Sequence, residues 1–149
     1  MVVLDELAGA LDDALSRIGD RWSLLIVLAL AEGSKRFNDL QGEVTGIAPN
    51  VLSQRLKTLE SLGVVVASRY SERPPRYAYG LTAAGAELSS AIRLLAAWGA
   101  DRSGRQEVAP RHGACGTRLE ARWYCPTCDR VVDEDQESDE EGAGEVTLL

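Results

Sequence analysis

The chain has 149 residues, 45% apolar and 26% charged, which is typical of one soluble globular domain with a small appendage. Its longest apolar run, residues 24–31, is shorter than the roughly 18 residues that a membrane-spanning helix needs. No basic-then-apolar signal peptide precedes this run, so the composition argues against a membrane protein and we expect a cytoplasmic one without a membrane partner.

The net charge of −7 is unevenly distributed. Residues 129–149 hold nine of the 23 acidic side chains and one of the 16 basic ones, which leaves 14 acids and 15 bases for residues 1–128. The body of the chain therefore has a net charge of +1, and the total charge does not exclude a nucleic acid as its partner.

Two helices are predicted at the N-terminus. The first covers about residues 4–18 and ends at Gly19, because apolar side chains recur there at helical spacing: Leu4, Leu7, Leu11, Leu15 and Ile18. Asp20 is expected to cap the second helix, "RWSLLIVLALAEG", which Gly33 ends. This helix is apolar on nearly all sides, so we expect it at the centre of the core.

The next segment, "KRFNDLQGEVTGIAPNVLSQRLKTLESLGVV", predicts two helices joined by a tight turn. Phe37, Leu40 and Val44 place one face of a short helix on the core, and Pro49 suits the first turn of the following helix. This helix–turn–helix is a common DNA-binding element, although many α-helical hairpins look similar.

The second of these helices, about residues 49–62, is expected to be amphipathic. Leu52, Leu56 and Leu59 form a stripe that should be buried. At 100° per residue, a polar set points away from this stripe: Asn50, Ser53, Gln54 and Lys57. Such side chains hydrogen-bond base edges and phosphates in a major groove, and the alternative is an ordinary solvated helix face.

A β-hairpin is predicted directly after the helix–turn–helix, over about residues 64–81. Two β-rich runs, Val64–Tyr70 and Arg76–Leu81, are joined by "SERPP", whose adjacent prolines cannot pair as central strand residues. From Lys35 to Tyr79 seven bases oppose four acids. We therefore interpret the hairpin as a wing rather than a surface decoration, and we expect contacts to DNA backbone or minor groove from Arg36, Arg69, Arg73 and Arg76.

These motifs together carry a family resemblance. "IGDRW", "RFNDLQ", "GIAPNVLSQRLKTLESLGVV", "YSERPPRYAYGLTAAG" and the closing "WG" resemble the HxlR-type winged helix-turn-helix transcriptional regulators, relatives of the MarR-like proteins, over roughly residues 9–100. The resemblance implies a homodimer on a pseudo-palindromic double-stranded DNA operator, with the helix from Pro49 in the major groove of each half-site. It leaves a small-molecule effector possible.

The sequence departs from the family pattern at two points. Many members carry a "CP" dipeptide that can act as a redox switch where Gly9 and Ala10 stand here. Many also carry Ser where Ala48 stands, so the following helix lacks a side-chain cap, at a cost of about 1 kcal/mol.

A further helix is predicted after Thr82, which can cap it. Its apolar side chains cover a broad face: Leu88, Ala91, Ile92, Leu94, Leu95 and Trp98. A small domain cannot easily cover such a face alone, so we expect this helix and the N-terminal one to form a homodimer interface. The alternative is that the helix only completes the core of its own chain.

The segment "RHGACGTRLEARWYCPTCDR" holds the only histidine and all three cysteines. His112 and Cys115 are separated by two residues, as are Cys125 and Cys128, a spacing typical of a closed zinc site. We expect one structural Zn²⁺ per chain on these four ligands, with two short strands in "TRLEARWY" between the knuckles. A reversible metal or redox sensor and free thiols are the alternatives.

The sequence thus predicts a mainly α-helical winged helix-turn-helix protein with a small β-hairpin wing and a zinc-ribbon-like C-terminal appendage. The expected divisions are a DNA-binding and dimerisation domain at 1–104, the ribbon at 105–132, and a disordered acidic tail at 133–149. The tail is interpreted as solubilising, with autoinhibitory contact to a basic surface as the alternative.

The expected function is sequence-specific regulation of transcription by a homodimer, without enzymatic activity. One alternative is a winged-helix and zinc-ribbon module that only contacts proteins of the transcription machinery. A thiol oxidoreductase built on "CPTC" is a weaker alternative. The dithiol motif of such enzymes lies at the N-terminus of a helix that follows a strand, and the sequence around Trp123 to Arg130 predicts no such helix.

Overall fold

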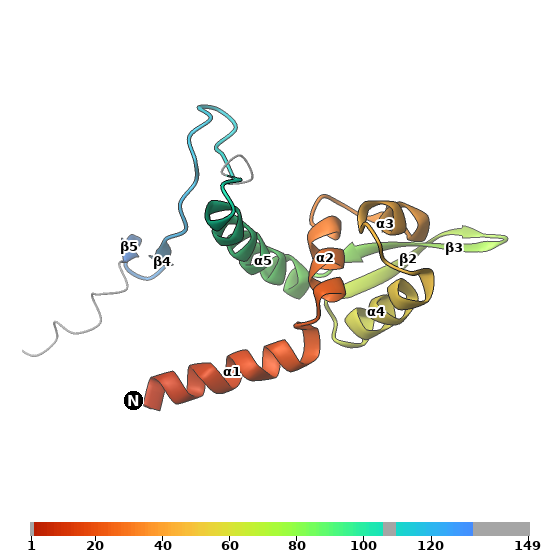
Figure 1. Ribbon diagram of the computed structural model, residues 1–149, viewed down its shortest axis with the longest axis horizontal. Helices are drawn as coiled ribbons and strands as arrows, with labels where there is room; N and C mark the ends of the chain where they lie inside the picture. The colour runs from red at the N-terminus through yellow and green to blue at the C-terminus, as the bar shows by residue number, and fades with distance from the viewer. Residues whose placement is uncertain (1, 106–109, 133–149) are drawn as a thin grey trace, which may run out of the picture. The chain divides into compact units, whose positions relative to one another are not determined.

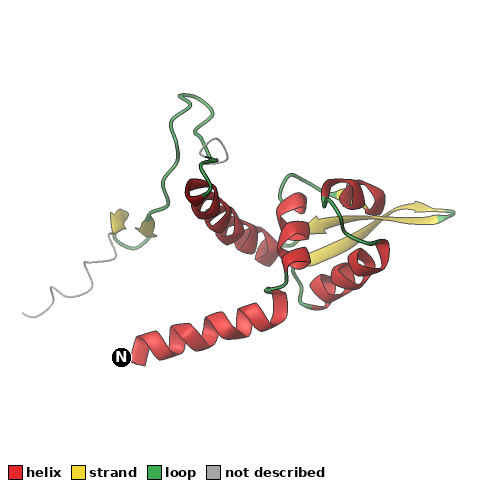
Figure 2. Cartoon of the chain, viewed as in Figure 1, coloured by secondary structure: helices red, strands yellow, loops and turns green. Residues whose placement is uncertain are grey.

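The computed structural model describes residues 2–105 and 110–132, with side chains from Leu4 onward. It separates into two compact units, Met1–Arg105 and Gln106–Leu149. Figure 1 shows the elements by residue number, and Figure 2 distinguishes helices from strands. The predicted acidic tail at 133–149 lies outside the described residues.

The first unit is mainly helical, with a small antiparallel sheet of strand order β1-β3-β2. Its elements in chain order are α1 (Val2–Ile18), α2 (Arg21–Leu30), β1 (Lys35–Arg36), α3 (Phe37–Glu43), α4 (Pro49–Ser61), β2 (Val65–Glu72), β3 (Pro75–Leu81) and α5 (Ala83–Arg102). This matches the predicted order of helices and hairpin.

The helix ends follow from local chemistry. The Asp20 carboxylate accepts the backbone N–H groups of Trp22 and Ser23, which confirms it as the cap of α2. Thr82 caps α5 by accepting the Gly85 N–H at 3.1 Å. Ala48 begins α4 without a side-chain cap, as its methyl group dictates.

The core of this unit lies around α2, as its nearly all-apolar sequence predicts. Ile26 and Val27 of α2 are almost fully buried, and they pack in one cluster with Leu40 of α3 and with the leucine stripe of α4 (Leu52, Leu56 and Leu59). The α4 stripe is at most 1% exposed. Its burial fixes which face of α4 is left for solvent or a ligand.

The hairpin is longer and its turn is tighter than the sequence suggests. We expected strands at 64–70 and 76–81 with "SERPP" as a loop, but β2 continues to Glu72 and β3 begins at Pro75. Glu72 and Pro75 are paired, and a register shift between Arg69 and Ser71 accommodates the extra residue. Proline is tolerated here because it sits at the first residue of the strand, where a donor can be lost.

The third strand, β1, was missed by the sequence analysis. Lys35 and Arg36 pair with Tyr79 and Ala78 of β3. A two-residue polar strand has no alternating pattern, so it forms only because β3 offers it an edge.

In the described part of the second unit, residues 110–132, β4 (Trp123–Cys125) pairs with β5 (Arg130–Val132) in a short hairpin. An isolated bridge joins Arg111 to Arg118. Of the two short strands expected within "TRLEARWY", one is present: β4 begins at Trp123, near the end of this segment, whereas Arg118 makes only the isolated bridge. The two do not pair with each other, because each cysteine-containing turn brings its own two flanks together.

No helix within the described ranges, 2–105 and 110–132, is both long and apolar enough to cross a membrane.

Candidate nucleic-acid interface

The exposed face of α4 carries the polar side chains expected to contact bases. Asn50, Gln54 and Lys57 are exposed, and Ser53 is half-buried at the edge of the face. The leucine stripe holds the opposite face in the core, so these four side chains share one side of the helix. α4 runs from Pro49 to Ser61, one residue short of the predicted end.

The hairpin carries a second group of cations. Arg73 lies at its tip, and Arg69 and Arg76 lie in the strands beside it; all three are exposed. The Arg69 guanidinium lies 5.9 Å from the centre of the Tyr77 ring, and its Nη2 is 3.5 Å from the tyrosine oxygen. Stacking of this kind restricts a long side chain before any ligand arrives.

Arg36 is joined to the hairpin in the same way. It precedes α3 in β1, yet its guanidinium lies 4.7 Å from the centre of the Tyr70 ring of β2. Two tyrosines of the hairpin, Tyr70 and Tyr77, are thus platforms for arginines. This relation depends on strand pairing and so has no signal in the sequence.

Two of the seven bases counted in this segment are held by acids. Lys35 Nζ lies 2.7 Å from Glu43 Oε1, and Arg55 Nε lies 3.3 Å from Asp20 Oδ1. The basic groups available to a phosphate backbone are therefore Arg36, Lys57 and the three hairpin arginines.

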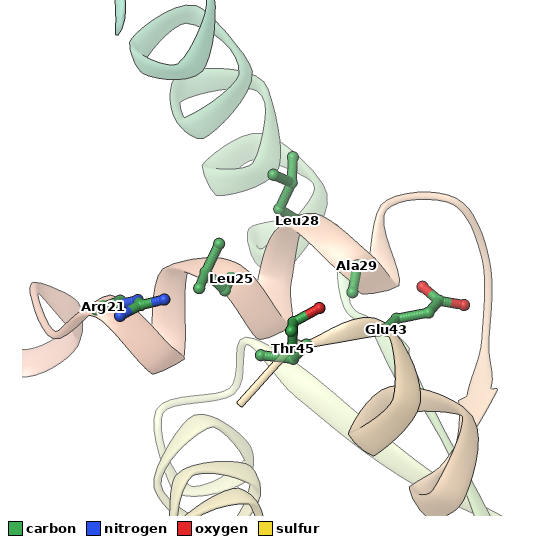
Figure 3. A pocket seen from close by; sticks show the side chains of 7 residues that line it. Arg21, Leu25, Leu28, Ala29, Glu43 and Thr45 are labelled. Carbon is green, nitrogen blue, oxygen red and sulfur yellow. The ribbon is translucent and has the colours of Figure 1, made fainter. Parts of the chain in front are cut away.

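A depression of about 400 Å³ lies between α2 and the end of α3, with Val44 among its lining residues (Figure 3). Leu25, Leu28 and Ala29 supply its apolar side from α2, and Glu43 and Thr45 lie across from them. Arg21, the first residue of α2, lines the depression where this helix begins.

The predicted zinc ligands form two separate pairs in the second unit. His112 Nδ1 is 3.2 Å from Cys115 Sγ, and hydrogen bonds link Cys125 with Cys128. All three cysteines are free thiols. In the part of the chain that the structure describes, no three histidine, cysteine or acidic side chains are gathered as for a metal ion.

The surroundings of two cysteines favour the thiolate. The Thr117 hydroxyl, 3.2 Å from the Cys115 sulfur, is the main cause that lowers the pKa of this thiol to about 7, and hydrogen bonds from the Thr117 backbone and from His112 add to it. Backbone hydrogen bonds from Cys128 and Thr127 lower the pKa of Cys125. Thiolates are the form in which cysteine ligates metals.

Two helices of the first unit leave apolar side chains uncovered. On α1, Leu4, Leu7, Leu11 and Leu15 are between 54% and 71% exposed. On α5, Ile92 is buried and Leu88 half-buried, whereas Leu94, Leu95 and Trp98 are more than half exposed. The apolar face of α5 is therefore only partly used in the core of its own chain.

A short helix–turn–helix with a polar outer face, followed by a hairpin with an arginine-rich tip, defines the winged helix-turn-helix class of DNA-binding proteins. The comparison with known proteins agrees. Residues 17–107 match the model of the HxlR-like helix-turn-helix family, and the chain belongs to this family.

Individual relatives support the assignment. An HTH-type transcriptional regulator of Mycobacterium tuberculosis is 37% identical over 134 residues, which is 88% of this chain and 84% of the relative. YtfH of Escherichia coli, also an HTH-type transcriptional regulator, is 36% identical over 86 residues, 58% of this chain and 68% of the relative. The crystal structure of the HTH-type regulator ytcD superposes with a TM-score of 0.59 at 33% identity, covering 64% of this chain and 97% of that structure.

These matches carry two consequences. The chain is a DNA-binding transcriptional regulator of the helix-turn-helix type and not an enzyme, so the thiol oxidoreductase alternative is wrong. The mycobacterial match covers 88% of the chain, more than residues 1–105 can supply, so the similarity reaches into the second unit.

Proposed function

We propose that this protein regulates transcription as a homodimer that reads a specific operator, with α4 in the major groove and the β2–β3 wing on the backbone or in the minor groove. The observation that carries this proposal is the division of α4 into two faces. Three leucines anchor one face in the core, and the other presents amides, a hydroxyl and a lysine to solvent.

The two groups of side chains have different roles. Asn50, Gln54 and Ser53 contact base edges, because amides and hydroxyls can both donate and accept hydrogen bonds in the pattern that base pairs display. Lys57, Arg73 and Arg76 contact phosphates. Arg36 and Arg69 do the same from positions that stacking on tyrosine already restricts, which reduces the entropy lost on binding.

The test compares Gln54→Ala with Arg73→Ala on a duplex selected by the wild-type protein from a random library, and on a scrambled duplex. Gln54→Ala should cost about 1–3 kcal/mol on the selected duplex, relax preference at one position per half-site, and leave the scrambled duplex unaffected. Arg73→Ala should weaken binding to both and reduce the slope of log K against log salt by about 0.9 per subunit.

Fluorescence anisotropy at several salt concentrations measures all these quantities. The two half-sites of the selected sequence should lie roughly 34–36 Å apart, one turn of duplex. If both variants keep the wild-type affinity and salt slope, the docking of α4 and the wing is wrong, and the alternative of a module that contacts only proteins gains support.

We propose that the dimer forms through α1 and α5. The support is the set of exposed apolar side chains on both helices, because apolar side chains gathered on one face mark an interaction site. A two-fold dimer would bring two copies of α4 to the two halves of a pseudo-palindrome.

We propose that the second unit binds one structural zinc ion through His112, Cys115, Cys125 and Cys128. The support is the donor set, three sulfurs and one imidazole nitrogen, and the formation of both turns with thiolate-favouring hydrogen bonds. The described geometry leaves the two pairs apart. Binding therefore requires the turns to come together, which is expected where metal binding and folding are coupled.

A transcriptional regulator of this kind can also respond to a small-molecule effector. The depression between α2 and the end of α3 is its candidate site, because its volume of about 400 Å³ lies within the range of small-molecule sites and its wall combines apolar side chains with the charged groups of Arg21 and Glu43. A ligand there would contact the end of α3 and the start of the turn, residues 44–48, that connects α3 to α4.

A further inference from the structure

Asp20 lies at the junction of two helices with different roles. α1, with its exposed leucines, ends at Ile18, and Asp20 then begins α2, the central helix of the core. The Asp20 carboxylate has two oxygens and uses both. Oδ1 accepts the N–H groups of Trp22 and Ser23 at 3.1 Å, and Oδ2 accepts the hydroxyl of the buried Ser23 at 2.5 Å.

The same carboxylate holds a residue of α4. Arg55 Nε lies 3.3 Å from Asp20 Oδ1, although the two residues are 35 positions apart in the sequence. The Arg55 and Asp20 side chains are 33% and 29% exposed. The Nε atom itself is buried and has no hydrogen bond of good geometry to any described residue. The ion pair with Asp20 is therefore the interaction that the structure gives this buried atom of a partly exposed guanidinium.

The charge of Asp20 is suited to this contact. Partial burial opposes ionisation of the carboxyl group, but hydrogen bonds from Ser23 and the attraction of Arg55 outweigh it and lower the pKa of Asp20 below its ordinary value. Asp20 is thus a carboxylate that is fixed by α2 and attracts a cation on α4.

The position of Arg55 makes this contact relevant to DNA. Arg55 follows Gln54 directly and lies between the exposed face and the buried leucine stripe. The leucine stripe fixes which face of α4 is buried, but apolar contacts are not directional and leave small rotations of the helix open. A charged contact at the edge of the stripe would restrict these rotations, and with them the direction in which Asn50, Gln54 and Lys57 point.

We infer that Asp20 is a positioning residue for DNA recognition: through Arg55 it sets the orientation of α4 on α2, at the point where α1 joins the domain. This inference rests on the proposed role of α4 in reading DNA. The inference goes beyond that role: the ability of the protein to distinguish its operator from other sequences depends on Asp20 and Arg55, two side chains that do not themselves contact a base.

The test uses Asp20→Asn in the full-length protein. Asparagine is as good a helix cap as aspartate, so α2 keeps its start while the charge that attracts Arg55 is removed. The matched control is Glu32→Gln, which neutralises the carboxylate of another ion pair, 2.7 Å from Arg93 of α5. This pair does not involve α4.

Affinity is measured for the duplex that the wild-type protein selects from a random library and for its scrambled counterpart, and urea unfolding is recorded for each variant. Asp20→Asn should reduce the ratio of the two affinities about fivefold or more, whereas Glu32→Gln should leave the ratio unchanged. Arg55→Met removes the other partner and should give the same loss, and the double variant should lose no more than either single one.

The outcomes distinguish failure of the proposed function from failure of the inference about Asp20. If wild-type protein selects no sequence, the proposed function fails and the inference fails with it. If wild-type protein discriminates and Asp20→Asn keeps its ratio, the inference alone is overturned. It is also overturned if Asp20→Asn weakens both duplexes equally, because Asp20 would then act through charge or stability and not through the orientation of α4.

Discussion

The proposed dimer can be tested by one charge on α1. Leu11 lies in the middle of the exposed stripe of this helix, and Leu11→Asp would place a carboxylate there. Ser16→Asp is the matched control. Ser16 is exposed on the same helix, and five residues at 100° each place it 140° from Leu11. Ser16→Asp therefore adds the same charge to α1 on a side away from the leucine stripe.

The size of the effect follows from the exposure of Leu11. Full burial of a leucine side chain contributes about 1.5–3 kcal/mol, and Leu11 is 58% exposed in the single chain. Covering the rest of this side chain in a dimer would therefore contribute about 1–2 kcal/mol per chain. A two-fold interface contains the residue twice, so its loss costs about 2–4 kcal/mol per dimer before any cost of burying carboxylates.

A loss of about 3 kcal/mol weakens the dimer by roughly a hundredfold. Sedimentation equilibrium over a wide range of protein concentration measures this change directly. Wild-type protein and Ser16→Asp should be dimers at micromolar concentration, and Leu11→Asp should be a monomer with unchanged helix content in circular dichroism. The reasoning is refuted if Leu11→Asp and Ser16→Asp have the same dissociation constant, or if the wild-type protein is itself a monomer.

Two further predictions concern zinc and stability. Protein purified without chelator should contain about one zinc ion per chain by elemental analysis, and the double substitution Cys125→Ser and Cys128→Ser should remove it; wild-type protein without zinc would contradict the proposal. Thr82→Ala should lower the free energy of unfolding by about 1–2 kcal/mol in urea, because the hydroxyl accepts the Gly85 N–H and donates to the Gly63 carbonyl at 2.6 Å. Ser90→Ala, on the exposed side of the same helix, should change this free energy by less than about 0.5 kcal/mol, and an equal effect of the two substitutions would exclude the capping argument.

The local sequence determined the order of the helices in the first unit and the buried face of α4. Leu52, Leu56 and Leu59 fall at i, i+4 and i+7, and this periodicity leaves only one way to bury them together. Asp20 and Thr82 could be recognised as caps because capping is also a local interaction: the side chain bonds to backbone groups two or three residues away. The polar face of α4 followed from the leucine stripe without any tertiary information.

The tertiary structure decided the relations between residues far apart in the chain. Strand β1 exists because β3 offers an edge to Lys35 and Arg36, and in that register the Arg36 guanidinium lies over the Tyr70 ring. The strands around "SERPP" extend into the expected loop because paired backbone groups can tolerate a proline at a strand start.

The contact between Asp20 and Arg55 has the same origin. No sequence pattern connects the two residues. Periodicity describes the faces of one helix at a time, whereas this ion pair joins residues of two different elements. Whether Arg55 belongs to the DNA-binding surface or to the core was therefore fixed only when α2 and α4 packed together. The sequence specified the chemistry of each helix face, and packing between the helices selected which charges remain free to meet DNA.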